Sequence, residues 1–171
     1  MYTIIVRTTV PMLLVFMLGA VSFAGEPPRP PVSSAPSIEG TYRLVSRQFP
    51  DGTMLKPPDL IGLWTYTKTH RNFNIITKAA TGKFRSYSVV STYMLTPTEY
   101  TETLLYGLRT DQIEGKEPVY DHSGQTGRAP VTVEGGRIQF KPPFDHAAFV
   151  FEGNKLTATR EGSIDVWEKV E

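Results

Sequence analysis

The sequence predicts an all-β domain, an antiparallel up-and-down β-barrel of about eight to ten strands. From residue 38 onward, short runs rich in Thr, Tyr, Val, Ile and Phe alternate with breaks of Gly, Pro, Asn and Asp. No convincing helical periodicity accompanies these runs, so a sheet must either close on itself or pack as a sandwich. Consecutive hairpins favour the barrel, because a sandwich usually needs long crossing connections.

The predicted strands follow one another with short breaks. The ten runs are 40–49, 60–68, 71–78, 83–95, 99–109, 130–134, 137–141, 147–152, 155–160 and 163–170. The first is entered through Gly40 and left through a Pro-Asp-Gly turn, and "EGG" at 134–136 and "EGN" at 152–154 are short enough for tight hairpins. The segment 110–129 is the one long link, and loops of that length are often functional or mobile.

The first 24 residues predict a signal peptide. A short start with the basic residue Arg7 precedes an apolar stretch that ends in small side chains, with Ser22 and Ala24 placed for cleavage before residue 25. The alternative is an uncleaved anchor, but the apolar stretch is shorter than the roughly 20 residues that a membrane span needs. We therefore expect a periplasmic or secreted protein without stable membrane insertion. The proline-rich residues 25–37 are expected to form a semi-rigid linker to a domain at 38–171.

Charge and cysteine content exclude several classes of function. Of the 18 basic residues one, Arg7, lies in the predicted signal peptide, which leaves 17 basic against 17 acidic residues. A neutral domain is a poor nucleic-acid binder, so no nucleic-acid partner is expected. The chain has no cysteine, which excludes disulfides, thiolate chemistry, cysteine-rich zinc sites and lipobox acylation.

The stretch "GTYRLVS", Gly40 to Ser46, resembles the first strand of the lipocalin-like (calycin) barrels, whose signature is Gly-x-Trp followed by an alternating strand. The resemblance extends to the "DG" turn at 51–52, to "IGLWTYTKTHRNFNIITK" as a second and third strand, and to "IDVWEKV" at 164–170 as a closing strand. The chain looks most like the small bacterial exported lipocalin-like domains of unassigned function.

This resemblance implies a structural role for the start of the first strand. In the family the glycine lets the chain approach the barrel floor, and the ring two residues later points inward. Here Tyr42 stands in place of the tryptophan, and its hydroxyl needs a partner when it is buried. In the family a basic residue of the last strand often packs over that ring, a position that Lys169 or Arg160 could fill.

The region 83–109 predicts a ligand-binding face. One face of its first strand carries Lys83, Arg85, Tyr87, Val89, Ser91, Tyr93 and Leu95, and one face of the next carries Tyr100, Glu102, Leu104 and Tyr106. Such a mixed face is typical of the lining of a cavity that is apolar in its inner part and polar at its opening. The predicted ligand-binding residues are Arg85, Tyr87, Tyr93, Tyr100, Tyr106 and His70. Alternatively the tyrosines lie on the outer face, and Phe84, Val90 and Met94 fill the interior.

No motif predicts catalysis, a cofactor or a metal. The three histidines, His70, His122 and His146, have no ligand spacing, and no Gly-x-Ser-x-Gly elbow is present. The resemblance therefore favours a binding protein for a small apolar or amphipathic, possibly acidic, ligand. Two alternatives stay open: an isomerase- or cyclase-type enzyme using His70 with Glu102, and an envelope interaction protein with a solid barrel that acts through residues 110–129.

Overall fold

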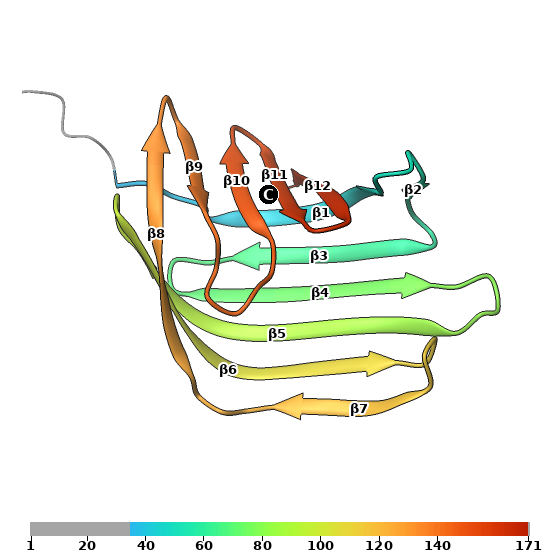
Figure 1. Ribbon diagram of the computed structural model, residues 1–171. Helices are drawn as coiled ribbons and strands as arrows, with labels where there is room; N and C mark the ends of the chain where they lie inside the picture. The colour runs from blue at the N-terminus through green and yellow to red at the C-terminus, as the bar shows by residue number, and fades with distance from the viewer. Residues whose placement is uncertain (1–34, 171) are drawn as a thin grey trace, which may run out of the picture. The chain divides into compact units, whose positions relative to one another are not determined.

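The computed structural model describes residues 35–170 (Figure 1). The predicted signal peptide and most of the predicted linker, residues 25–34, lie outside the described residues. Within them the protein is all-β and has no helix. The strands are β1 (Gly40–Gln48), β2 (Met54–Leu55), β3 (Leu60–Tyr66), β4 (His70–Lys78), β5 (Phe84–Leu95), β6 (Glu99–Asp111), β7 (Lys116–Asp121), β8 (Thr126–Glu134), β9 (Arg137–Phe140), β10 (Ala148–Glu152), β11 (Lys155–Arg160) and β12 (Ser163–Lys169). Residues 35–170 hold no helix of the length and apolarity that would cross a membrane.

Ten of these strands form a closed antiparallel barrel with up-and-down connectivity, which confirms the predicted fold class. Successive strands are neighbours from β3 to β6 and from β8 to β12, and β12 pairs with β1 to close the sheet. The short strand β2 adds to β1, and β7 adds to β6. In Figure 1 the strands β9 and β10 run steeply across the nearly horizontal strands β3 and β4, on the viewer's side of them.

All ten predicted runs are strands, but the predicted long loop at 110–129 is wrong. β6 continues to Asp111, β7 returns along it, and β8 begins at Thr126, so only short turns remain. The sequence does not reveal β7 as a strand, because every residue in Lys116–Asp121 is exposed and no alternation of apolar residues marks a buried face. β5 and β6, with 12 and 13 residues, are the longest strands of the barrel.

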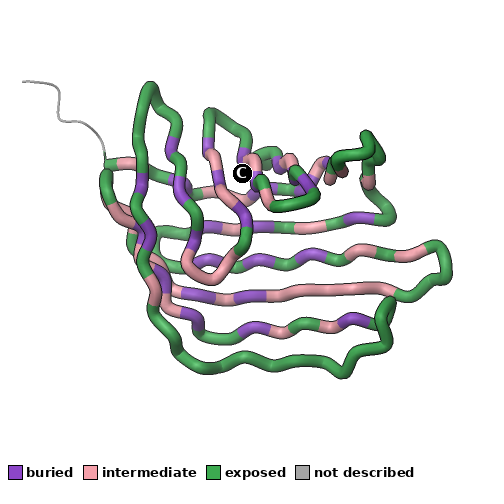
Figure 2. The backbone as a smooth tube through the Cα atoms, in the orientation of Figure 1, coloured by how far each residue is buried: buried purple, intermediate pink, exposed green. Residues whose placement is uncertain are grey.

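Aromatic side chains fill the interior. Trp64 lies 5.3 Å from Trp167 and 4.8 Å from Phe149, and Tyr100 stacks on Phe140 at 4.4 Å, measured between ring centroids. Buried and exposed residues alternate along the strands, as Figure 2 shows most clearly for β4. The interior is therefore a packed core built from both walls of the barrel.

Tyr42 lies where the family resemblance placed it. Its ring is buried, its hydroxyl donates to the carbonyl oxygen of Ile38 at 3.2 Å, and the Nζ atom of Lys169 lies 6.0 Å from the ring centroid. Burial raises the pKa of the Tyr42 hydroxyl to about 12. Gly40 has a φ of 140°, which a side chain would disfavour. The start of β1 thus has the backbone freedom and the inward ring that the motif requires.

Two β-bulges change which residues face inward. In β1 the register shifts between Leu44 and Ser46. Without this shift Ser46 would lie opposite the buried Asp165, but with it Arg47 pairs with Asp165. In β6 the register shifts at residue 105, because Ser91 pairs with residue 104 and Val90 with residue 106. A bulge moves every later side chain to the opposite face. The inner face of β6 therefore passes from the even-numbered residues to Gly107, Arg109 and Asp111.

Candidate functional site

A pocket of about 470 Å³ opens at the end of the barrel where the β5–β6–β7 wall is longest. One side is formed by the inner faces of β4–β7, and the other by the segment 144–146 with Arg47 of β1 and Arg160 of β11. Both bulges bring an arginine to this end of the barrel. The pocket is thus a consequence of strand length and of register together.

The pocket combines an apolar wall with a concentration of cations. Its apolar and aromatic lining residues are Phe73, Ile75, Tyr87, Val119 and Phe144. Its arginines are Arg47, Arg85, Arg109 and Arg160, its aspartates are Asp121 and Asp145, and Thr77, Ser86 and His146 complete the lining. A pocket with a mainly apolar surface and a few convergent polar groups is typical of small-molecule sites.

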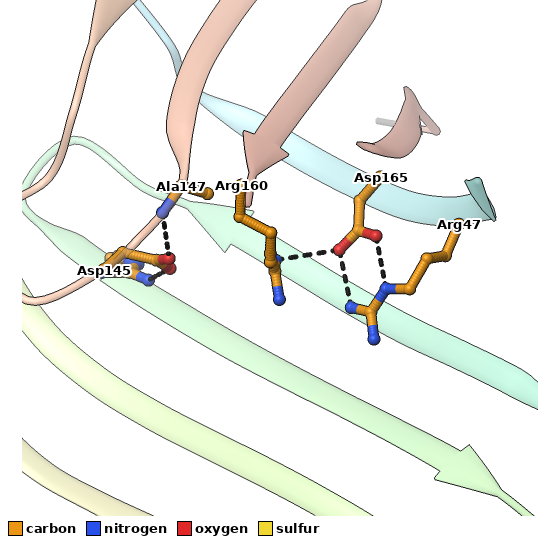
Figure 3. Close-up of polar contacts among 6 residues, drawn as sticks. Arg47, Asp145, Ala147, Arg160 and Asp165 are labelled. Atoms are coloured by element: carbon orange, nitrogen blue, oxygen red, sulfur yellow. Dashed lines mark hydrogen bonds and ion pairs between the residues drawn. The ribbon is translucent and has the colours of Figure 1, made fainter. Parts of the chain in front are cut away.

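Two of the arginines share one buried carboxylate (Figure 3). Asp165 has a fully buried side chain, and its oxygens accept from Nε and Nη2 of Arg47 at 2.6 and 2.8 Å and from Nη2 of Arg160 at 3.0 Å. The two arginine side chains are 15% and 30% exposed. Asp165 therefore fixes both guanidinium groups from behind and leaves further N–H donors, among them the buried Arg160 Nε, without a partner in residues 35–170.

Arg85 is held in the same way on the opposite wall. Its Nε donates to Asp111 at 2.8 Å, and its Nη2 donates to Glu114. Burial raises the pKa of the Asp111 carboxyl, but the hydrogen bonds from Arg85 and from the backbone N–H of Glu114 outweigh this and hold it below its usual value. Asp111 thus stays ionised. Arg109 is exposed and forms no ion pair or side-chain hydrogen bond within residues 35–170.

A fifth arginine lies behind the apolar wall. Arg71 of β4 is 2% exposed, donates through Nη1 to Glu102 Oε1 at 2.5 Å, and places its Cζ 4.8 Å from the Trp64 ring centroid. Burial lowers the pKa of the Arg71 guanidinium, whereas its interactions with Tyr66, Glu102 and their neighbours raise it above the usual value. Arg71 therefore remains charged inside the barrel.

The predicted ligand-binding residues fall into three groups. Arg85 and Tyr87 line the pocket. Tyr93 and Tyr100 face inward too, but they stack on one another at 5.8 Å and belong to the packed aromatic core. His70 and Tyr106 are exposed, and the prediction that Tyr106 shares the inner face is wrong, because the bulge leaves it on the outer face with 53% of its surface exposed.

The structure also shows which face of β5 points into the barrel. Val89 and Ser91 are buried, whereas Met94 is exposed, so the alternative with Phe84, Val90 and Met94 inside is wrong. Arg47, Arg109 and Arg160 were not predicted as site residues. No sequence signal marks the two bulges that place Arg47 and Arg109, because the bulged residues are an ordinary valine and leucine.

The structure does not bring His70 and Glu102 together. The His70 ring is exposed and its Nδ1 lies 2.8 Å from Thr69 Oγ1, whereas Glu102 is fully buried beside Arg71. The two side chains lie on opposite faces of the sheet, so they cannot act as an acid–base pair. Among residues 35–170 no group of three or more His, Cys, Asp or Glu side chains is arranged to hold a metal ion.

A second hollow, of about 280 Å³, is lined by residues 61–63 of β3 and 74–76 of β4 and has no charged side chain. Its surface is mainly aliphatic, and Asn74 supplies its one polar side chain. The charged pocket is therefore the candidate site. No protein-family model, curated protein or solved structure matches this chain.

Proposed function

We propose that this domain is a lipocalin-like binding protein that holds a small, partly apolar molecule with an acidic group in the charged pocket. The observation that carries the proposal is the juxtaposition of an aromatic wall with four arginines, of which Arg47, Arg85 and Arg160 are held by carboxylates. Guanidinium groups that are fixed in advance bind carboxylates well, because little side-chain entropy is lost when the ligand arrives.

The site of binding is the end of the barrel rather than its middle. Tyr93, Tyr100 and Phe140 stack in the interior, so a ligand finds its apolar contacts on Phe73, Tyr87 and Phe144 at the pocket. Contacts of this extent support an affinity on the order of micromolar, about −8 kcal/mol. The acidic group is then held by the positive charge of the arginines that surround the pocket.

Naphthoate and its neutral analogue naphthylmethanol test this proposal. Saturable binding of naphthoate to the wild type is expected, followed by titration calorimetry or by tryptophan fluorescence. Arg109→Met should weaken naphthoate about tenfold, the effect of losing one nearby positive charge, and leave naphthylmethanol unchanged. Arg109 is the best choice because its replacement breaks no ion pair within residues 35–170.

Arg43→Met is the matched control. Arg43 is exposed on β1 and does not line the pocket, so its loss should change neither affinity. Equal weakening of naphthoate by Arg43→Met and Arg109→Met would show that only the overall charge matters. Absence of saturable binding of either compound to the wild type would refute the proposed function.

The alternative function, in which a protein partner docks on residues 110–129, is less well supported. β7 has a free edge in residues 35–170, but it carries Lys116, Glu117 and Pro118. Charged side chains and proline are the devices by which natural edge strands avoid pairing with other chains. The edge strand therefore favours a solvated wall of the pocket.

We also propose that the protein acts outside the cytoplasm, in the periplasm or as a secreted protein, after cleavage before Gly25. The support is the sequence of residues 1–24, with its basic start, apolar centre and small residues at Ser22 and Ala24. N-terminal sequencing of exported protein should begin at Gly25. Material that begins at Met1 would contradict this proposal.

A further inference from the structure

The carboxylate of Asp145 lies between the pocket and Arg71. Its Oδ1 accepts from the backbone N–H of Ala147 at 3.0 Å (Figure 3). Its Oδ2 lies 3.7 Å from Arg71 Nη2. A separation of 3.7 Å is too long for a hydrogen bond, so Asp145 and Arg71 attract each other without bonding. Asp145 lines the pocket and is 15% exposed, whereas Arg71 is shielded behind it.

The surroundings of Arg71 hold more hydrogen-bond donors than acceptors. Buried polar atoms without a partner in residues 35–170 include Nε of Arg71, the hydroxyls of Tyr66, Tyr100 and Ser91, Nε1 of Trp64 and, as an acceptor only, Oε2 of Glu102. Tyr66 and Ser91 are the cross-strand partners of Arg71 on β3 and β5. Burying such groups without partners is costly. This part of the barrel is therefore suited to a ligand that brings oxygen acceptors.

We propose that Arg71 is the deep anchor for the acidic group of the ligand, and that the Asp145 carboxylate occupies this place in the free protein. The inference rests on the proposed function. Binding then exchanges one carboxylate for another: the side chain of Asp145 swings toward solvent, and the ligand's acidic group takes the same volume beside Arg71. The packed interior needs no further cavity for this exchange.

The segment that carries Asp145 is anchored at its base. Gly127 of β8 lies so close to Pro143 that a Cβ at position 127 would lie 2.5 Å from the Pro143 Cβ. This close packing and the hydrogen bond from the backbone N–H of Asp145 to the carbonyl oxygen of Pro142 at 3.3 Å hold the segment, while the Asp145 carboxylate itself is held by one hydrogen bond from a backbone N–H and one long ion pair. The exchange therefore requires a side-chain movement of Asp145 and no displacement of the segment.

Competition by Asp145 lowers the apparent affinity for an acid. If Asp145 occupies the place beside Arg71 for about nine-tenths of the time, Asp145→Asn should tighten naphthoate about tenfold, because the apparent dissociation constant scales with the inverse of the competent fraction. Naphthylmethanol, which has no charge to attract Arg71, should change by less than about twofold.

Asp121→Asn is the matched control for this test. Asp121 lines the same pocket, and its carboxylate accepts from the backbone N–H of Ser123 at 3.0 Å instead of facing Arg71. Loss of its charge should tighten naphthoate by less than about threefold, the effect of one solvent-screened charge. Equal tightening by Asp121→Asn and Asp145→Asn would overturn the exchange while leaving the proposed function intact.

A second background tests Arg71 itself. Arg71→Met with Glu102→Gln removes both members of the buried pair, so that no uncompensated charge is left inside the barrel. In that background Asp145→Asn should no longer tighten naphthoate. Continued tightening would show that Asp145 acts on the rim arginines and would overturn the assignment of Arg71. The chain's two tryptophans, Trp64 and Trp167, are both in the core, and Trp64 lies against Arg71, so its fluorescence reports binding there.

Failure of the two proposals can be distinguished. If the wild type binds naphthoate but Asp145→Asn does not tighten it, the exchange is wrong and the pocket function stands. If neither the wild type nor Asp145→Asn binds either compound, the proposed function fails together with the exchange.

Discussion

Replacement of Asp165 by asparagine removes the shared counter-charge of Arg47 and Arg160. Three hydrogen bonds, of 2.6, 2.8 and 3.0 Å, join the carboxylate to the two guanidinium groups. Bonds to charged groups contribute about 1.5–3 kcal/mol each, so their sum sets an upper bound of about 4.5–9 kcal/mol. Both arginines reach solvent and regain hydration, and asparagine keeps one acceptor oxygen. A loss of about 3 kcal/mol in the free energy of unfolding is therefore expected.

Urea unfolding followed by tryptophan fluorescence measures this loss. With a slope of about 1–3 kcal/mol/M, the midpoint should fall by about 1–3 M. Glu168→Gln is the control, because Glu168 is exposed on the same strand, and its loss should lie within about 0.5 kcal/mol. A loss below about 1 kcal/mol in Asp165→Asn would refute the view that this carboxylate holds the two arginines in place.

The remaining predictions concern the core. Tyr42→Ala should cost about 3–5 kcal/mol in urea unfolding, whereas Tyr42→Phe, which loses only the hydrogen bond to Ile38, should cost about 1 kcal/mol; equal costs would show that the ring is not packed. Burial raises the pKa values of the Tyr66 and Tyr100 hydroxyls well above 10. These pKa values in the folded protein exceed the value in the unfolded chain. The two hydroxyls therefore contribute fully to the free energy of unfolding below pH 10, and this contribution is lost as the pH rises above it. Phenolate absorbance should therefore show Tyr66 and Tyr100 ionising only as the barrel unfolds in alkali, and ionisation without unfolding would contradict their burial.

Strand alternation predicts most of this fold but not its register shifts. The positions of Tyr87, Val89, Ser91 and Tyr93 on one face follow directly from a period of two, and all four face inward. The same period fails beyond residue 104 of β6, because a bulge is a property of how two strands pair rather than of one strand's composition. Tyr106 was therefore placed on the wrong face.

The candidate site was predicted only in part for a related physical reason. Arg85 and Tyr87 lie on an uninterrupted strand, and their inner position could be inferred from it. Arg47 and Arg109 reach the pocket through bulges, and Arg47 also needs the β1–β12 pairing to meet Asp165. Arg160 meets Asp165 across the local β11–β12 hairpin. Contacts between strands as distant as β1 and β12 depend on closure, which local pattern does not encode.

The pairing of β12 with β1 makes the first and the last strand of the domain neighbours in the barrel. Lys169 pairs with Tyr42, and the backbone N–H of Val170 donates to the carbonyl oxygen of Thr41 at 2.7 Å, so the two ends of the barrel sequence lie side by side. A circular permutant could link these two ends and open the chain at the exposed Gly135–Gly136 turn. It would keep every pairing between strands and would lose only the turn that connects β8 to β9. In the natural order closure has to wait for the last strand, and such non-local pairing is slow. The permutant would make β1 and β12 a local hairpin, and β8 with β9 would become the pair of terminal strands that closes the barrel. The closing seam would therefore move from one side of the barrel to another, while one non-local pairing would still be required.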